Sequence, residues 1–86
     1  MNKHHYVTKF VVRNLSPSMT AEKLNRIFAE YGVVQSVRLT QDVMTGRCGG
    51  LGFVSLDETV TGTACDALDG SRHGGRVIRV ALERKS

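Results

Sequence analysis

The residues Gly49-Gly50-Leu51-Gly52-Phe53-Val54-Ser55-Leu56 carry the clearest structural signal in the sequence. From Leu51 to Leu56 the side chains alternate as in a half-buried β-strand, and Thr45-Gly46 and Gly49-Gly50 predict a loop before it. Two sets of side chains would point to opposite sides of this strand: Leu51, Phe53 and Ser55, and Gly52, Val54 and Leu56. Only the strand register decides which set is buried, so the sequence leaves both alternatives open.

The residues that precede this stretch predict a first strand over Tyr6 to Arg13. Its two sides differ in composition, with Phe10 and Val12 on one and Lys9, Val11 and Arg13 on the other. This period of two is typical of a half-buried strand. The run Asn14-Leu15-Ser16-Pro17 then ends the strand, and Asn14 is predicted to form the turn rather than to contact a ligand.

A helix and a second strand are predicted between these two strands. The helix begins after Thr20, a residue type favoured at the N-cap, and its apolar positions before the stop at Gly32 are Leu24, Ile27, Phe28 and Tyr31. Val33 to Thr40 alternates again as a strand, with Val37 and Leu39 inward and Arg38 and Thr40 outward.

The last third of the sequence predicts a second helix and a final strand. The helix runs over residues 58–68, and Gly62 in its interior would cost about 1 kcal/mol relative to alanine. The strand runs from Arg76 to Glu83, and its two sides are Ile78, Val80 and Leu82, and Val77, Arg79, Ala81 and Glu83. The resulting order β-α-β-β-α-β predicts an α+β, ferredoxin-like fold with a four-stranded antiparallel sheet and both helices on one face.

The length and composition of the chain indicate the number of domains and the charge of a binding partner. With 86 residues we expect one domain over residues 1–86, with a core of about 7–83. Twelve Lys and Arg against eight Asp and Glu give a formal charge of +4, which favours a polyanionic partner. Two cysteines in unlike contexts, Cys48 in a loop and Cys65 in a helix, predict a reduced, intracellular protein, cytoplasmic or nuclear. Neither a signal peptide nor a membrane span is predicted.

Two segments of the chain resemble the signatures of the RNA-recognition-motif family, and the likeness extends from about Lys9 to Glu83. The family's longer signature is K/R-G-F/Y-G/A-F-V-x-F/Y. The stretch from Gly49 to Leu56 fits it at Gly50, Gly52, Phe53 and Val54, and departs from it at Gly49, Leu51 and Leu56. The shorter signature resembles residues 10–15, where Asn14 and Leu15 fit and Val11 stands where an aromatic residue is usual.

This resemblance implies a single-stranded RNA ligand on the open side of the sheet, with single-stranded DNA as a weaker alternative. Phe53 would stack on a base, and Val11 and Leu51 would offer apolar area without a ring. Basic side chains would neutralise phosphates or stack: Arg13, Arg38 and Arg79 from the same face, Lys9 beside them, and Arg47 in place of the basic residue missing at Gly49. Because two rings are missing, we expect modest, salt-dependent affinity.

The competing functions differ in how well the residues support them. We expect a monomer that acts in RNA processing or regulation. We expect no catalysis, because no plausible Ser-His-acid set or Cys-x-x-Cys pair occurs in the sequence. No cofactor is expected, and His4-His5 lacks the third ligand that a metal would need. The main rival is a protein-binding module on the same fold, in which Val11, Leu51 and Phe53 form an apolar patch.

Overall fold

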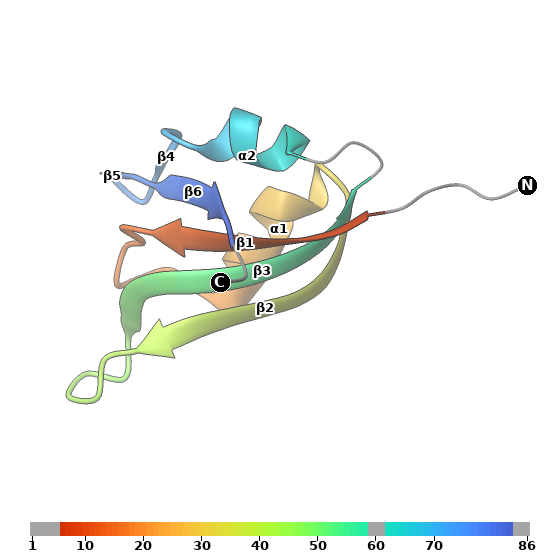
Figure 1. The fold of residues 1–86 in the computed structure, drawn as a ribbon. Coiled ribbons are helices and arrows are strands. Elements are labelled where there is room, and N and C mark those ends of the chain that lie inside the picture. Colours follow the sequence, from red (N-terminus) through yellow and green to blue (C-terminus); the bar gives the residue numbers. More distant parts are fainter. Residues whose placement is uncertain (1–5, 59–61, 84–86) are drawn as a thin grey trace, which may run out of the picture.

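The computed structural model describes residues 6–58 and 62–83, which form two helices and six strands (Figure 1). In chain order these are β1 (Tyr6–Arg13), α1 (Ala21–Ala29), β2 (Val33–Gln41), β3 (Cys48–Glu58), α2 (Thr63–Leu68), β4 (Arg72–His73), β5 (Arg76–Val77) and β6 (Arg79–Leu82). Four strands form an antiparallel sheet in the order β2-β3-β1-β6, while β4 and β5 pair separately. The predicted α+β fold with its four-stranded sheet is confirmed.

Both helices lie on the same side of the four-stranded sheet (Figure 1). The core between them combines buried side chains of the two layers: Leu24, Phe28, Ala64 and Leu68 from the helices, and Phe10, Val12, Val54, Leu56 and Val80 from the sheet. The rings of Phe10 and Phe28 meet with their centroids 5.5 Å apart. Neither helix covers the opposite side of the sheet, as the sequence predicts.

The register of β3 decides the alternative that the sequence left open. Val11 pairs with Phe53, and Phe10 pairs with Val54, so Gly52, Val54 and Leu56 are buried and Phe53 points to the other side. A Cβ atom at Gly52 would lie 3.0–3.1 Å from the side chains of Leu15, Leu24 and Leu39. The inner side of β3 therefore has little room for a side chain at position 52.

The strand β3 is longer than the sequence predicted, because it extends beyond Leu51–Leu56 at both ends. It begins at Cys48, which the sequence assigned to the loop. Cys48 is 9% exposed and belongs to the core cluster. The assignment of Cys48 to an open loop is therefore wrong: backbone pairing with Gln41 continues the sheet to this residue.

Helix α1 begins as predicted and ends earlier. The Thr20 hydroxyl accepts a hydrogen bond from the Lys23 N–H at 3.1 Å, which is the geometry of an N-cap. The helix ends at Ala29, and the Tyr31 N–H bonds to the Phe28 carbonyl in a tighter turn. At Gly32 a Cβ atom would overlap the Asp57 carbonyl oxygen. Gly32 is therefore required by the close approach of β3.

Helix α2 is shorter than the predicted helix over residues 58–68. Glu58 lies in β3, buried at 1% exposure, and its carboxylate accepts hydrogen bonds from the N–H groups of Gly62 and Ala64, each at 3.1 Å. Gly62 is the N-cap with φ of 91°, so the interior-glycine cost does not apply. Glu58 thus links the end of β3 to the start of α2. Val60, another predicted helical position, lies outside the described residues.

The predicted final strand over Arg76 to Glu83 is divided in two. β5 pairs with β4 in a small hairpin, whereas β6 pairs with β1. Between them Ile78 is fully buried, and its N–H bonds to the Ser71 carbonyl at 2.9 Å instead of joining the main sheet. Ile78 and Val80 face the core, whereas Leu82, from the same side of the predicted strand, is 45% exposed at the sheet edge.

Candidate nucleic-acid interface

The open face is the side of the four-stranded sheet opposite α1 and α2. Its exposed and half-buried side chains come from alternate strand positions: Lys9, Val11 and Arg13 on β1, Ser36 and Arg38 on β2, Leu51, Phe53 and Ser55 on β3, and Arg79 and Ala81 on β6. Every sequence-predicted site residue except Arg47 lies on this face. The alternation of each strand therefore gathers residues that are far apart in the sequence.

The central row of the open face is the set Arg38, Phe53, Val11 and Ala81, which are neighbours across β2, β3, β1 and β6. Phe53 is half-buried within this row, whereas Phe10 and Phe28 are 0% exposed in the core. Phe53 is thus the one of the three phenylalanines that the core does not use. The predicted outward direction of the Phe53 side chain is confirmed. On β2, the central row ends in the guanidinium group of Arg38.

A second row crosses the sheet next to the central row. Arg13 on β1 lies opposite Leu51 on β3 and opposite Arg79 on β6. Both arginine side chains are exposed. The Nε atom of Arg79 lies 3.2 Å from Oδ1 of Asp69, so part of its charge is already neutralised. Of the two arginines, Arg13 is the stronger candidate for an added anion.

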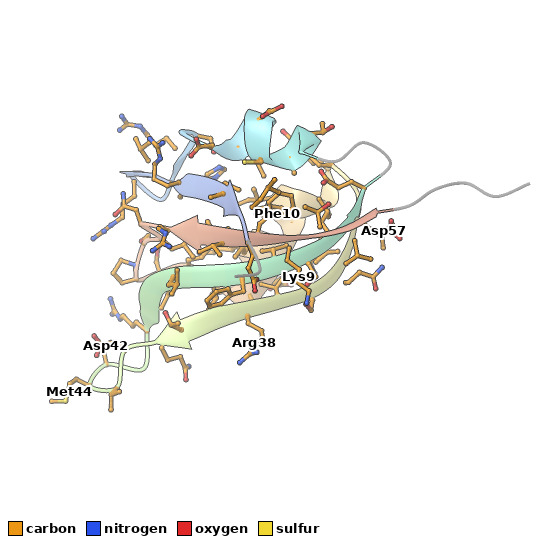
Figure 2. The ribbon with its side chains drawn as sticks, viewed as in Figure 1. Lys9, Phe10, Arg38, Asp42, Met44 and Asp57 are labelled. Carbon is orange, nitrogen blue, oxygen red and sulfur yellow. The ribbon has the colours of Figure 1, made fainter. Side chains whose placement is uncertain are left out.

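A shallow hollow lies on the other side of the central row. Its lining combines a ring, hydroxyls and charges of both signs: Lys9, Ser36, Arg38, Phe53, Ser55 and Glu83. Figure 2 shows that Lys9 comes from β1 and Arg38 from β2, so the two cations approach the hollow from different strands. The Glu83 carboxylate opposes them. The hollow can accept a polar ring beside Phe53 and a phosphate near either cation.

The structure does not bring Arg47 together with the other predicted residues. Arg47 is exposed in the loop between β2 and β3, and it lines a separate hollow with Pro17, Met19 and Cys48 near the start of α1. The nearby Gly49 has a steric explanation. A Cβ atom there would lie 2.9 Å from Oγ1 of Thr40, whose hydroxyl donates to the Leu51 carbonyl at 3.1 Å. Thr40 thus occupies space that a basic side chain at position 49 would need.

Sequence reasoning missed a polar contact at the end of β1. Asn14 has φ of 64°, which agrees with its predicted turn role. Its side chain also donates from Nδ2 to the Val77 carbonyl at 2.9 Å and accepts at Oδ1 from Arg76 at 3.0 Å. The 62 residues that separate Asn14 from Arg76 explain why no local pattern revealed the contact.

The thiol of Cys65 lies behind the sheet and away from the open face. Burial, and then the carboxylates of Asp69, Asp66 and Glu58, raise the pKa of this thiol. Its Sγ donates to the Val80 carbonyl at 3.2 Å. A thiol with a raised pKa is a poor nucleophile and a poor metal ligand at neutral pH, so we assign Cys65 a packing role.

The described part of the chain contains neither a metal-binding cluster nor a membrane-spanning helix. Within residues 6–58 and 62–83, no group of three or more His, Cys, Asp and Glu side chains could hold a metal ion. His4 and His5 lie outside these ranges. None of the helices in the same ranges is long and apolar enough to cross a membrane.

The family model for the RNA recognition motif matches residues 11–79. The match covers most of the chain and includes both central strands, so the protein belongs to the RNA-recognition-motif family. The resemblance noted in the sequence is therefore confirmed.

Relatives and solved structures agree with this family. Two proteins of Nostoc sp. are similar to the chain: "Putative RNA-binding protein RbpE", 44% identical over 74 residues (85% of this chain and 75% of the relative), and "Putative RNA-binding protein RbpB", 47% identical over 70 residues (80% and 68%). RNA binding protein PG1 superposes with a TM-score of 0.79 at 33% identity, covering 92% of this chain and 99% of that one. The SXL-lethal protein in complex with RNA gives 0.80 at 29% identity, covering 88% and 47%.

Proposed function

We propose that this protein binds single-stranded RNA across the open face, as a non-catalytic module of RNA processing or regulation. Phe53 stacks on one base, while Val11 and Leu51 pack beside it. Arg13, Arg38, Arg79 and Lys9 neutralise phosphates or stack on neighbouring bases. Arg47 reaches the strand only where the RNA continues past the loop between β2 and β3.

The observation that carries this proposal is the position of Phe53 in the central row. A half-buried ring on the face opposite the helices, with Arg38 on one side and Val11 on the other, offers a base a flat apolar partner within reach of a cation. Base stacking on such a ring contributes about 1–3 kcal/mol. Membership of the RNA-recognition-motif family and the names of the Nostoc relatives support RNA as the ligand.

The charges around the ring favour a polyanion and limit its affinity. Lys9, Arg13 and Arg38 are exposed cations on the face, whereas Glu83 opposes them in the hollow and Asp69 pairs with Arg79. For single strands, each neutralised phosphate contributes about 0.7 to the slope of log K against log salt concentration. We therefore expect modest affinity that falls as salt is raised.

The kind of nucleic acid and the location of the protein are inferred from the family and from the cysteines. Stacking on one ring does not distinguish RNA from single-stranded DNA, so we infer RNA from the family and keep single-stranded DNA as the weaker alternative. An intracellular location, predicted from cysteine usage, stays a prediction. Cys48 and Cys65 are both free thiols in the structure.

An amide-resolved NMR titration with a pool of short single-stranded RNAs tests the proposal directly. Repeating it at raised salt separates phosphate contacts from apolar ones. We expect the shifts to centre on Val11, Arg38, Phe53 and Arg79 and to fade with salt. A parallel titration with DNA of the same sequences measures the preference for RNA.

The same titration distinguishes the rival function. The half-buried apolar side chains of Val11, Leu51 and Phe53 are neighbours on the open face, as a protein-binding patch would require. If RNA shifts no amide of the open face, RNA binding there is rejected and the protein-binding module becomes the leading function.

A further inference from the structure

We propose that Arg76, held by Asn14 and grouped with Arg13 and Arg79, forms a phosphate-binding site at the end of the open face. A bound single strand would then continue from Phe53 past Arg13 onto the β4–β5 hairpin. This inference rests on the proposed function, because the phosphate that it assigns to Arg76 belongs to the RNA on the open face.

Asn14 holds Arg76 beside the end of β1 through its side-chain amide. Asn14 directly follows Arg13, the last residue of β1, and its Nδ2 is fixed by the Val77 carbonyl at 2.9 Å. This bond leaves Oδ1 to accept from Nη1 of Arg76 at 3.0 Å. One amide side chain thus ties the β4–β5 hairpin to the end of the main sheet and restrains an exposed guanidinium group.

Restraint of this kind suits a binding residue. An arginine that is ordered before the ligand arrives loses less side-chain entropy on binding. A guanidinium group has five N–H donors, and the bond to Asn14 engages Nη1, so donors remain for a phosphate oxygen. Arg76 is exposed and can present them to a ligand.

The end of the open face next to Arg76 carries uncompensated positive charge. Arg13 and Arg79 lie directly opposite each other across β1 and β6, and like charges in that arrangement repel. Asp69 pairs with Arg79. Arg76 is bonded to Asn14, the residue that follows Arg13, so its charge adds to those of Arg13 and Arg79 near the end of β1, where a phosphate group would relieve the repulsion.

The matched variants R76Q and R26Q test the site in the whole 86-residue protein. Both remove one exposed arginine charge, but Arg26 lies on α1, where it pairs with Glu22 at 3.3 Å. Affinities for mixed-sequence single-stranded RNAs of about four and about ten nucleotides are measured by fluorescence anisotropy over a range of salt. R76Q should weaken the longer RNA about fivefold at low salt and lower its salt slope by about 0.7. R26Q should change neither quantity appreciably.

The variant N14G tests the positioning role of Asn14. Glycine accepts the φ of 64° and removes both side-chain hydrogen bonds. N14G alone should weaken the longer RNA about twofold to threefold with its salt slope nearly intact, since Arg76 remains. In a protein that already carries R76Q, N14G should cost no further affinity. R76K should restore the salt slope but only part of the affinity.

The outcomes separate this inference from the proposed function. If F53A weakens RNA binding while R76Q and R26Q behave alike, the open face binds RNA and the Arg76 site is rejected. If N14G weakens binding equally with and without R76Q, Asn14 does not act through Arg76, and its positioning role is rejected. If the unchanged protein binds neither RNA, the proposed function fails and the inference fails with it.

Discussion

The two faces of the sheet are built from the same strands but differ in the burial and polarity of their side chains. On β1, Phe10 and Val12 are 0% exposed toward the helices, while Lys9 and Arg13 are exposed on the open face. The inner face is filled with apolar side chains and accepts little charge. The open face gathers cations around one ring. One step along a strand therefore separates residues that stabilise the fold from residues available to a ligand.

The largest effect that this contrast predicts is on stability. Phe10→Ala removes a fully buried ring that packs against Phe28, and should lower the free energy of unfolding by about 3–5 kcal/mol. Urea unfolding followed by circular dichroism measures the loss. The matched change Phe53→Ala on the open face should cost about 1 kcal/mol or less, because that ring is only half-buried. Equal losses for the two variants would contradict the division of roles between the faces.

For RNA binding, we expect the ring of the open face to matter more than the rings of the core. Phe53→Ala should weaken binding of the RNA pool by about 1–3 kcal/mol, which is roughly fivefold to 150-fold, because the stacking ring is lost. Phe53→Leu is the sharper variant, since leucine keeps apolar area and removes the π-system. If Phe53→Leu binds RNA as well as the unchanged protein does, the ring acts only as apolar surface. Fluorescence anisotropy titrations measure both variants.

An aromatic residue at position 11, where the family signature usually has one, should strengthen RNA binding. Val11→Phe places a second ring next to Phe53 in the central row, and should strengthen RNA binding by about 1 kcal/mol. Val33→Phe is the control, because Val33 is 65% exposed on β2 but lies outside this row. A Val11→Phe protein that binds no more tightly than the control would indicate that the base does not reach β1.

The sequence predicted the elements that depend on local pattern. Alternation gave the two sides of β1 and the inward side chains of β2, and the resemblance to the family gave the outward Phe53. The second helix was misplaced because Glu58 favours a helix by type, yet its carboxylate is buried where it caps α2 from the end of β3. A side chain that bonds to the backbone of another segment is not revealed by the hydrophobic periodicity of the sequence.

The candidate site shows the same limit. Strand parity was enough to group Arg13, Arg38 and Arg79 on the open face, and the structure confirms that grouping. Neither the partial neutralisation of Arg79 by Asp69 nor the contact between Asn14 and Arg76 follows from parity. Arg76 and Arg79 lie on either side of the break at Ile78, where one predicted strand becomes two.

The smallest predicted effect concerns charge behind the sheet. Because burial and nearby carboxylates raise the pKa of the Cys65 thiol, the unfolded chain ionises it at lower pH than the folded protein does. The resulting stability is fully present below the ordinary cysteine pKa of about 8.5 and is lost as pH rises toward the raised folded value. Cys65→Ala should therefore lose less stability than the unchanged protein between neutral and alkaline pH, as measured by thermal unfolding. Parallel curves would show that this position tolerates a thiolate, contrary to the penalty that burial and the nearby carboxylates place on its charge.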